Sequence, residues 1–184
     1  PMTFEWFERP SDDRLGVALS LLERLGLLHQ GRVTEEAQIL RRLPLHPRLA
    51  RVLIDGKGSF EAAAACAWLS EPGRADARDQ STSCDLLPII DAWPRMPFHL
   101  KQIAENLARS AAAVLGERCE RHLDETRFRR AVLAGYPDRV AKRRSDGRVT
   151  LATGHGAVMG RDSGVRDGEW LVALDVASVG ALRR

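Results

Sequence analysis

The segment from Leu43 to Leu53, with the sequence Leu-Pro-Leu-His-Pro-Arg-Leu-Ala-Arg-Val-Leu, constrains the fold more than any other part of the chain. Its second proline suits the first position of a helix, because its fixed φ is helical and no N–H is needed there. The sequence therefore predicts a short helix from Pro47 to about Asp55, with Gly56 ending it in a left-handed conformation. Its apolar residues recur at helical spacing: Leu45, Leu49, Val52 and Leu53. Its arginines fall elsewhere on the helix surface: Arg48 and Arg51.

Before this segment, the sequence predicts two further helices and a small turn. Ser11 is a plausible N-cap for a helix whose leucine stripe ends at Gly26. Gln30-Gly31 separates two very short strands, and Thr34 caps a helix to Leu40. This order is winged-helix-like. Winged-helix proteins read DNA through the third helix, but here that helix is short and partly buried, so we favour a structural hub.

The sequence predicts that the middle of the chain is entirely helical. An alanine-rich run from Ser59 to Leu69 has high helix propensity and small side chains. Ser83 is a plausible N-cap for a helix to Ile90, with Pro88 in its first turn. A longer helix carries an apolar face from Leu100 to Leu115, and Asp124 or Thr126 begins another that Gly135 ends.

The last part of the chain has a different sequence pattern, which predicts strands. Short β-prone runs near residues 149–152, 157–159 and 170–174 are separated by glycines. The basic charge is also concentrated here, since residues 1–122 hold 16 Lys+Arg against 17 Asp+Glu and residues 123–184 hold 12 against 8. A polyanionic partner is therefore sought first in this third of the chain.

The composition describes a soluble globular protein, with 44% hydrophobic and 29% charged residues. No apolar run is long enough to span a bilayer, and the first residues do not resemble a signal peptide. The cysteines are odd in number and widely spaced, which disfavours a disulfide framework and favours a reducing compartment. They are Cys66, Cys84 and Cys119. We expect a cytoplasmic protein with no membrane partner.

Two motifs carry a resemblance to a known family. The run Leu-Pro-Leu-His-Pro-Arg-Leu-Ala-Arg at residues 43–51 resembles the winged-helix region behind the motor domains of DEAH-box RNA helicases. The run Arg-Arg-Ala-Val-Leu-Ala-Gly-Tyr-Pro-Asp-Arg-Val-Ala at residues 129–141, followed by Glu-Trp-Leu-Val at 169–172, resembles the bacterial HrpB-type ATP-dependent helicases. Both motifs stand in family order, and the resemblance covers nearly the whole chain.

The resemblance implies a mainly α fold with a small β part, in three units. These are a winged-helix unit at 1–56, a helical ratchet-like domain at 57–135 and a partial OB-like β domain at 136–184. Three or four strands are too few to close a barrel, so we expect the chain to stop inside or just after this last domain.

The motifs of a helicase motor are absent from the sequence. Gly56-Lys57-Gly58-Ser59 departs from the phosphate-binding pattern, because Arg51 stands five residues before Gly56 and Gly58 replaces the hydroxyl residue. The chain should therefore be inactive alone, with ATP and Mg bound only in motor domains of the parent. Cys119 and His122 are too few ligands for a structural zinc. His46 is expected to be a cap or packing residue, not a catalyst.

The best candidate site is the basic segment from Arg139 to Arg148, which holds five basic residues and one acid. Basic side chains at this density attract the phosphate backbone of a nucleic acid whatever its base sequence. In isolation, a solvated strand and turn is an equally good interpretation, but in the resembled helicases this segment opens a domain that lines the single-strand channel. Tyr136 and Trp170 could stack on bases, although core positions are the favoured interpretation of both. The predicted binding residues are Arg139, Lys142, Arg143, Arg144, Arg148, Arg129 and Arg130, with Arg127 as a possible extension.

We therefore expect an accessory region of an RNA helicase that binds single-stranded RNA or DNA and braces the parent's own motor domains. The helix from Leu100 to Leu115 is expected to lie along the strand's path. Two other functions remain open. One is a stand-alone winged-helix regulator of duplex DNA, and the other is a scaffold that binds only protein.

Overall fold

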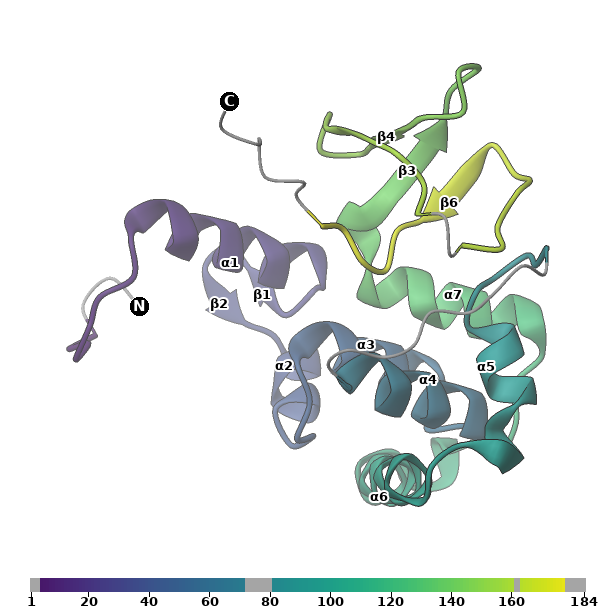
Figure 1. Cartoon of the computed structure of the whole chain (residues 1–184). Helices are drawn as coiled ribbons and strands as arrows, with labels where there is room; N and C mark the ends of the chain where they lie inside the picture. The colour runs from purple at the N-terminus through teal and green to yellow at the C-terminus, as the bar shows by residue number, and fades with distance from the viewer. Residues whose placement is uncertain (1–3, 72–80, 161–162, 178–184) are drawn as a thin grey trace.

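The computed structural model describes residues 4–71, 81–160 and 163–177, and within these it is mainly helical with two small antiparallel sheets (Figure 1). Its first part is a helix, a two-stranded hairpin and two helices. Their bounds are α1 Asp12–Arg24, β1 Leu28–His29, β2 Arg32–Val33, α2 Glu35–Leu40 and α3 Pro47–Asp55. The predicted order of elements in this part is confirmed.

The predicted caps of the first two helices are also confirmed. The side chain of Ser11 accepts a hydrogen bond from the Arg14 amide, and that of Thr34 accepts one from the Ala37 amide. Gln30 and Gly31 both have positive φ, at 49° and 74°, which is the backbone of a tight hairpin turn. Local sequence chemistry therefore determines where each of these elements begins and turns.

Helix α3 packs against α4 (Phe60–Ser70) and α7 (Glu125–Gly135), so it lies at the centre of the helical part (Figure 1). Leu49, Val52 and Leu53 are buried, as their spacing predicts. The prediction of a left-handed Gly56 is wrong, because its φ is −75° and the positive φ angles belong to Lys57 and Gly58. A Cβ on Gly56 would lie 2.4 Å from the Ala62 Cβ, so close packing is what requires glycine there.

Within the described residues, the middle of the chain has four more helical segments, and one predicted cap is wrong. They are α5 Leu87–Asp91, η1 Trp93–Arg95, α6 Phe98–Leu115 and η2 Gly116–Arg118. Ser83 does not cap α5, which begins without a side-chain cap after Leu86, and the Ser83 hydroxyl instead donates to Glu125 at 2.8 Å. Pro88 lies in the first turn, as predicted. The buried face of α6 packs against the alanine-rich α4.

The predicted role of Gly135 is also wrong. It does not stop α7 by a left-handed turn but is the last residue of the helix, with Tyr136 as C-cap. A Cβ at this position would lie 2.5 Å from the Val52 Cγ2 and 2.6 Å from the Arg48 carbonyl oxygen. Glycine therefore permits the close approach of α7 to α3.

A short 3-10 helix, η3 Pro137–Arg139, leads into a four-stranded antiparallel sheet. The strands are β3 Val140–Arg143, β4 Val149–Leu151, β5 Gly156–Ala157 and β6 Trp170–Val172. Their spatial order is β5-β4-β3-β6, so β6 is an edge strand that pairs with β3 alone in the described sheet. One face of the sheet covers a small core of its own: Ala141, Val149 and Leu151 with Ala157, Met159, Leu171 and Ala173.

The two motifs at residues 43–51 and 129–141 are joined directly. The guanidinium of Arg48 donates two hydrogen bonds to the carboxylate of Asp138, at 2.6 and 2.8 Å. It also donates to the Gly135 carbonyl oxygen at 3.3 Å and lies 5.3 Å from the ring centroid of Tyr136. Tyr136 is 7% exposed, which confirms its predicted core position. Arg48 therefore ties the first part of the chain to the start of the sheet.

Candidate nucleic-acid interface

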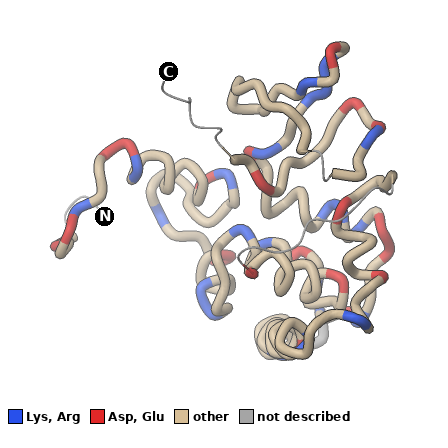
Figure 2. Tube along the Cα trace, viewed as in Figure 1, with Lys and Arg blue, Asp and Glu red and all other residues tan. Residues whose placement is uncertain are grey.

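The basic segment forms strand β3 and the turn that follows it, and Figure 2 shows its positive charge gathered along that strand. Because side chains alternate across a strand, Ala141 and Arg143 share one face of the sheet while Lys142 and Arg144 share the other. Ala141 is 1% exposed and belongs to the small core. The face that carries Lys142 and Arg144 is therefore turned away from that core.

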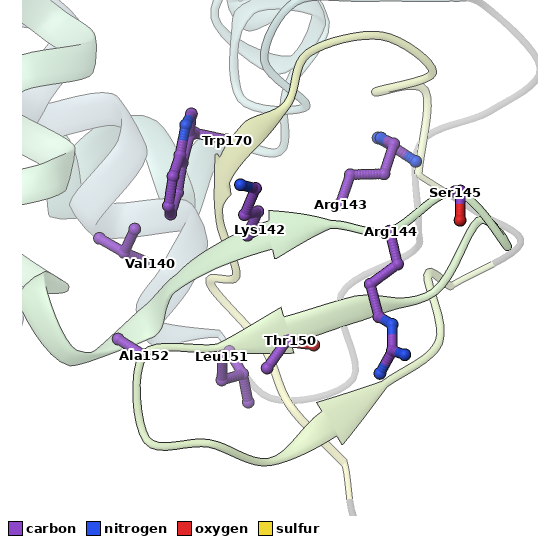
Figure 3. A pocket seen from close by; sticks show the side chains of 9 residues that line it. All are labelled: Val140, Lys142, Arg143, Arg144, Ser145, Thr150, Leu151, Ala152 and Trp170. Atoms are coloured by element: carbon purple, nitrogen blue, oxygen red, sulfur yellow. The ribbon is translucent and has the colours of Figure 1, made fainter.

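This outward face, which we call the open sheet face, is formed by Lys142, Arg144, Thr150 and Trp170. Lys142 lies opposite Thr150 on β4 and opposite Trp170 on β6. These residues line a hollow of about 580 Å³ together with Val140, Arg143, Ser145, Leu151 and Ala152 (Figure 3). The register of the sheet thus gathers two basic side chains and one aromatic ring around a single open concavity.

The environment of Trp170 differs from the one predicted from the sequence. It is 61% exposed, so the core interpretation of this side chain is overturned. The Nζ atom of Lys142 lies 5.3 Å from the centroid of its ring and 3.1 Å from the Glu169 carboxylate. An exposed indole held beside an ammonium group is an arrangement that suits stacking on an unpaired base.

Arg143 has a different environment from its neighbours. Figure 3 shows its side chain leaving the strand in the direction opposite to that of Arg144. Its Nε donates to the Gly168 carbonyl oxygen at 3.1 Å and its Nη2 to the Val165 carbonyl oxygen at 3.2 Å. This guanidinium is occupied by backbone groups of the segment from Ser163 to Glu169.

Arg144 and Arg148 face each other across the turn between β3 and β4. The Arg144 amide donates to the Arg148 carbonyl oxygen at 2.8 Å, and Gly147 provides the positive φ of 79° that the turn requires. Both side chains are exposed, and neither has an ion-pair partner among the described residues. They are therefore available to an external anion.

The remaining predicted binding residues lie on other elements. Arg129 on α7 pairs with Glu125 at 3.1 Å, and Arg127 pairs with Glu120 at 2.5 Å. Arg130 is exposed and has no ion-pair partner in the described ranges. Arg139 lines a separate hollow of about 500 Å³ with residues around the start of α3. The structure brings Lys142 and Arg144 together on the open sheet face and leaves these arginines outside it.

The Gly56-Lys57-Gly58-Ser59 turn does not fit the phosphates of a nucleotide. Its four backbone amides all donate within the fold, at 2.8–3.0 Å, to the carbonyl oxygens of Val52, Ile54, Leu53 and Gly56. Ser59 is fully buried, and its hydroxyl caps α4. The amides that would cradle a phosphate are therefore already used.

The histidine and cysteine candidates have structural environments. His46 is the N-cap of α3, with its Nδ1 accepting from the Arg48 amide at 3.3 Å, which confirms its predicted role. His122 lies in a loop, 2.9 Å from the Glu61 carboxylate. Burial raises the pKa of the Cys66 thiol. Within the described residues, no three His, Cys, Asp or Glu side chains are grouped to hold a metal ion, and no helix has the length and apolarity to cross a membrane.

Comparisons with known proteins identify a helicase relative. No family model matches the chain. The ATP-dependent RNA helicase HrpB of Escherichia coli (strain K12) is 30% identical over 177 residues, which are 94% of this chain and 20% of that protein. The chain thus spans about a fifth of the length of this curated relative.

Solved structures give the same result. The crystal structure of the E. coli DExH-box NTPase HrpB matches with a TM-score of 0.77 and 27% identity, over 98% of this chain and 21% of that one. The crystal structure of the Escherichia coli DEAH/RHA helicase HrpB matches with a TM-score of 0.70 and 28% identity, over 93% and 21%. The resemblance that the two motifs indicate is therefore confirmed: this chain is similar, over nearly all of its length, to a C-terminal accessory region of the HrpB-type DEAH-box helicases.

Proposed function

We propose that this chain is the accessory region of an ATP-dependent RNA helicase, in which it binds single-stranded nucleic acid and braces the motor domains. The observation that carries the binding proposal is the exposed Trp170 beside Lys142 and Arg144 on the open sheet face. The helicase part of the proposal rests on the HrpB relatives, which are named as an RNA helicase and an NTPase. In this proposal, ATP and Mg bind, and ATP is hydrolysed, in motor domains that this sequence does not contain, in a cytoplasmic parent.

The chemistry of the open sheet face favours single strands. Unpaired bases can stack on an exposed indole, whereas the bases of a duplex are already stacked on each other. Arg144 and Lys142 would meet the phosphates on either side of such a base, and neither contact reads base identity. We expect the site to accept many sequences, with RNA and DNA both bound and affinity strongly dependent on salt.

The bracing role is supported by the contacts of α3 and Arg48. We propose that residues 1–56 act as a winged-helix unit, 57–135 as a ratchet-like unit and 136–184 as an OB-like unit. Arg48 joins the first unit to the third, and α3 packs against helices of the second. A rigid block of this kind can hold α6 along the path of a strand, as the sequence resemblance implies.

The duplex-DNA alternative is disfavoured by the same contacts. A recognition helix must present its side chains to the major groove. Four residues of α3 are buried, Arg48 is occupied by Asp138, and Arg51 lies 2.5 Å from the carboxylate of Asp55. This helix therefore has few side chains left with which to read bases.

Replacing Trp170 by alanine is expected to weaken binding of the 184-residue chain to a fluorescein-labelled oligouridylate. Loss of one stacked base costs about 1–3 kcal/mol, which is roughly 5- to 150-fold in the dissociation constant. Phe7→Ala is the matched control, because Phe7 is also an exposed aromatic residue but lies before α1, away from the sheet and from α6. Fluorescence anisotropy at two salt concentrations measures both variants.

Arg144→Glu is expected to weaken binding and to reduce its dependence on salt. Each phosphate contact in a single strand contributes roughly 0.7 to the slope of log K against log salt concentration. Arg95→Glu, on the exposed end of η1, makes the same change of charge away from the site. Unchanged affinity and slope in both Trp170→Ala and Arg144→Glu would overturn the proposed site. Tighter binding of duplex DNA would favour the regulator, and no binding to either would favour the protein scaffold.

A further inference from the structure

The segment from Ser163 to Glu169 is held from one side by residues that precede α5. The carboxylate of Asp85 accepts two hydrogen bonds from it, from the Ser163 hydroxyl and from the Gly164 amide, both at 2.8 Å. The Thr82 amide donates in the other direction, to the Gly164 carbonyl oxygen at 2.9 Å. Hydrogen bonds to a carboxylate are roughly twice as strong as neutral ones, so Asp85 is the principal attachment.

The same segment is held from the other side by the sheet. Arg143 reaches the Val165 and Gly168 carbonyl oxygens with its side chain, and its amide donates to the Glu169 carbonyl oxygen at 2.8 Å. The next residue along the chain is Trp170, which begins the edge strand β6. Hydrogen bonds therefore hold this segment at both ends, from Asp85 at Ser163 and Gly164 and from Arg143 as far as Glu169, the residue before the exposed Trp170.

The attachment at Asp85 is itself fixed to the helical part of the chain. Leu86 is 3% exposed in the main core, and the hydroxyl of Ser83 donates to Glu125 at the start of α7. In contrast, β6 has only three residues and one neighbouring strand in the described sheet. The position of Trp170 therefore depends strongly on the segment before it. A residue in a central strand would be held by a paired strand on each side.

We propose that Asp85 is a positioning residue for nucleic-acid binding, which acts through Ser163, Gly164 and Arg143 to hold Trp170 in place on the open sheet face. This inference rests on the proposed function. We assign Arg143 the same positioning role. The charge pattern of the sequence suggests that its guanidinium contacts phosphate, whereas its hydrogen bonds go to the carbonyl oxygens of Val165 and Gly168. Both hydrogen bonds of the Asp85 carboxylate in the described residues go to Ser163 and Gly164, and neither the motifs nor the charge pattern of the sequence indicate this residue.

The test is a double-mutant cycle between Asp85→Ala and Trp170→Ala, measured by anisotropy with the labelled oligouridylate. Asp85→Ala alone is expected to weaken binding roughly fivefold or more, a usual size for coupling between separate positions. It should leave the salt slope unchanged, because no phosphate contact is lost. In the Trp170→Ala background the same substitution should have little further effect, since residues that act through one another are not additive.

Hydrogen exchange reports on the attachment without nucleic acid. In Asp85→Ala, the amides of residues 163–171 are expected to exchange faster while those of α3 and α6 do not. Ser163→Ala removes only one of the two hydrogen bonds to Asp85, together with a longer one from the Val165 amide at 3.3 Å, and should have a smaller effect on both exchange and affinity. Asp91→Ala, at the exposed end of α5, removes the same charge and should change neither.

The outcomes separate the two proposals. If Trp170→Ala loses binding and Asp85→Ala keeps both wild-type affinity and wild-type exchange, the positioning role is overturned and the proposed function stands. If Asp85→Ala is equally harmful with and without Trp170, Asp85 acts on stability or elsewhere, which also overturns the role. If Trp170→Ala binds like the wild type, the open sheet face is not the binding site, and both proposals are overturned.

Discussion

Gly135→Ala is expected to lower the free energy of unfolding by about 2–4 kcal/mol, a large cost for one methyl group. The new Cβ would lie 2.5 Å from the Val52 Cγ2 and 2.6 Å from the Arg48 carbonyl oxygen. Val52 is fully buried, so its side chain has little room to rotate, and the carbonyl belongs to the backbone of α3, so it can move only if the helix shifts. The substitution therefore separates α3 from α7, the two helices at the junction of the motifs.

Urea denaturation of the 184-residue chain measures this prediction, and Gly16→Ala is its matched control. Gly16 lies inside α1, and a Cβ there would have no atom within 4 Å. That substitution is expected to raise stability by about 0.5–1 kcal/mol, because alanine is the better helix former. Equal midpoints for the two variants would show that the approach of α7 to α3 does not depend on glycine.

The elements that sequence predicted correctly are those that depend on neighbours in the chain. Ser11 and Thr34 cap helices because their side chains reach amides three residues away, and Pro47 begins α3 because its own ring fixes φ. Ser83 fits the same pattern but fails as a cap. Its hydroxyl is used by Glu125, 42 residues further on, and a local pattern contains no information about such a partner.

The predictions that failed depend on packing between distant segments. Glycine is required at Gly56 and Gly135 because atoms of another helix lie close to them. The sequence-based prediction instead used the common case, in which a glycine ends a helix by adopting a left-handed backbone. Trp170 occurs in an apolar run, which favours the core, yet its exposure follows from the pairing of β6 with Lys142 on β3. Only the strand register shows which face of the sheet each side chain occupies.

The sequence predicted the basic segment that carries the candidate site, but not which of its side chains share a face of the sheet. Five basic residues within ten indicated β3 and its turn, and Lys142 and Arg144 do lie on the open sheet face. Arg143 also lines the hollow, but backbone carbonyl oxygens of Val165 and Gly168 occupy its guanidinium. Whether Lys142 and Arg144 bind nucleic acid stays a prediction.

Arg48→Ala is expected to destabilise the chain by about 2–4 kcal/mol, because it leaves a largely buried carboxylate with only a longer ion pair among the described residues, to the Arg139 Nε at 3.7 Å. The side chains of Arg48 and Asp138 are 13% and 17% exposed, and their two hydrogen bonds are parallel. Arg129→Ala is the matched control, since Arg129 and Glu125 form an ion pair whose side chains are 45% and 46% exposed. A pair of that exposure contributes about 0.5 kcal/mol or less.

The same pair makes stability depend on pH in a defined direction. The hydrogen bonds from Arg48 are the main reason that the pKa of Asp138 lies below its ordinary value of 3.8. A carboxyl whose pKa is lower in the folded state stabilises the fold fully above its unfolded pKa, and this contribution is lost as pH falls through the folded pKa. We therefore expect part of the acid destabilisation below about pH 4 to disappear in Arg48→Ala.

The double variant Arg48→Ala with Asp138→Asn separates the ion pair from packing. Arg48→Ala alone leaves a carboxylate without its two short hydrogen bonds, whereas the double variant leaves only a neutral amide that can still accept one hydrogen bond. The double variant should therefore be more stable at pH 7 than the sum of the two single losses predicts, and its stability should change least between pH 7 and pH 4. Strictly additive losses, with the acid sensitivity intact in Arg48→Ala, would show that the two motifs are held together by the packing of α3 on α7 and not by this ion pair.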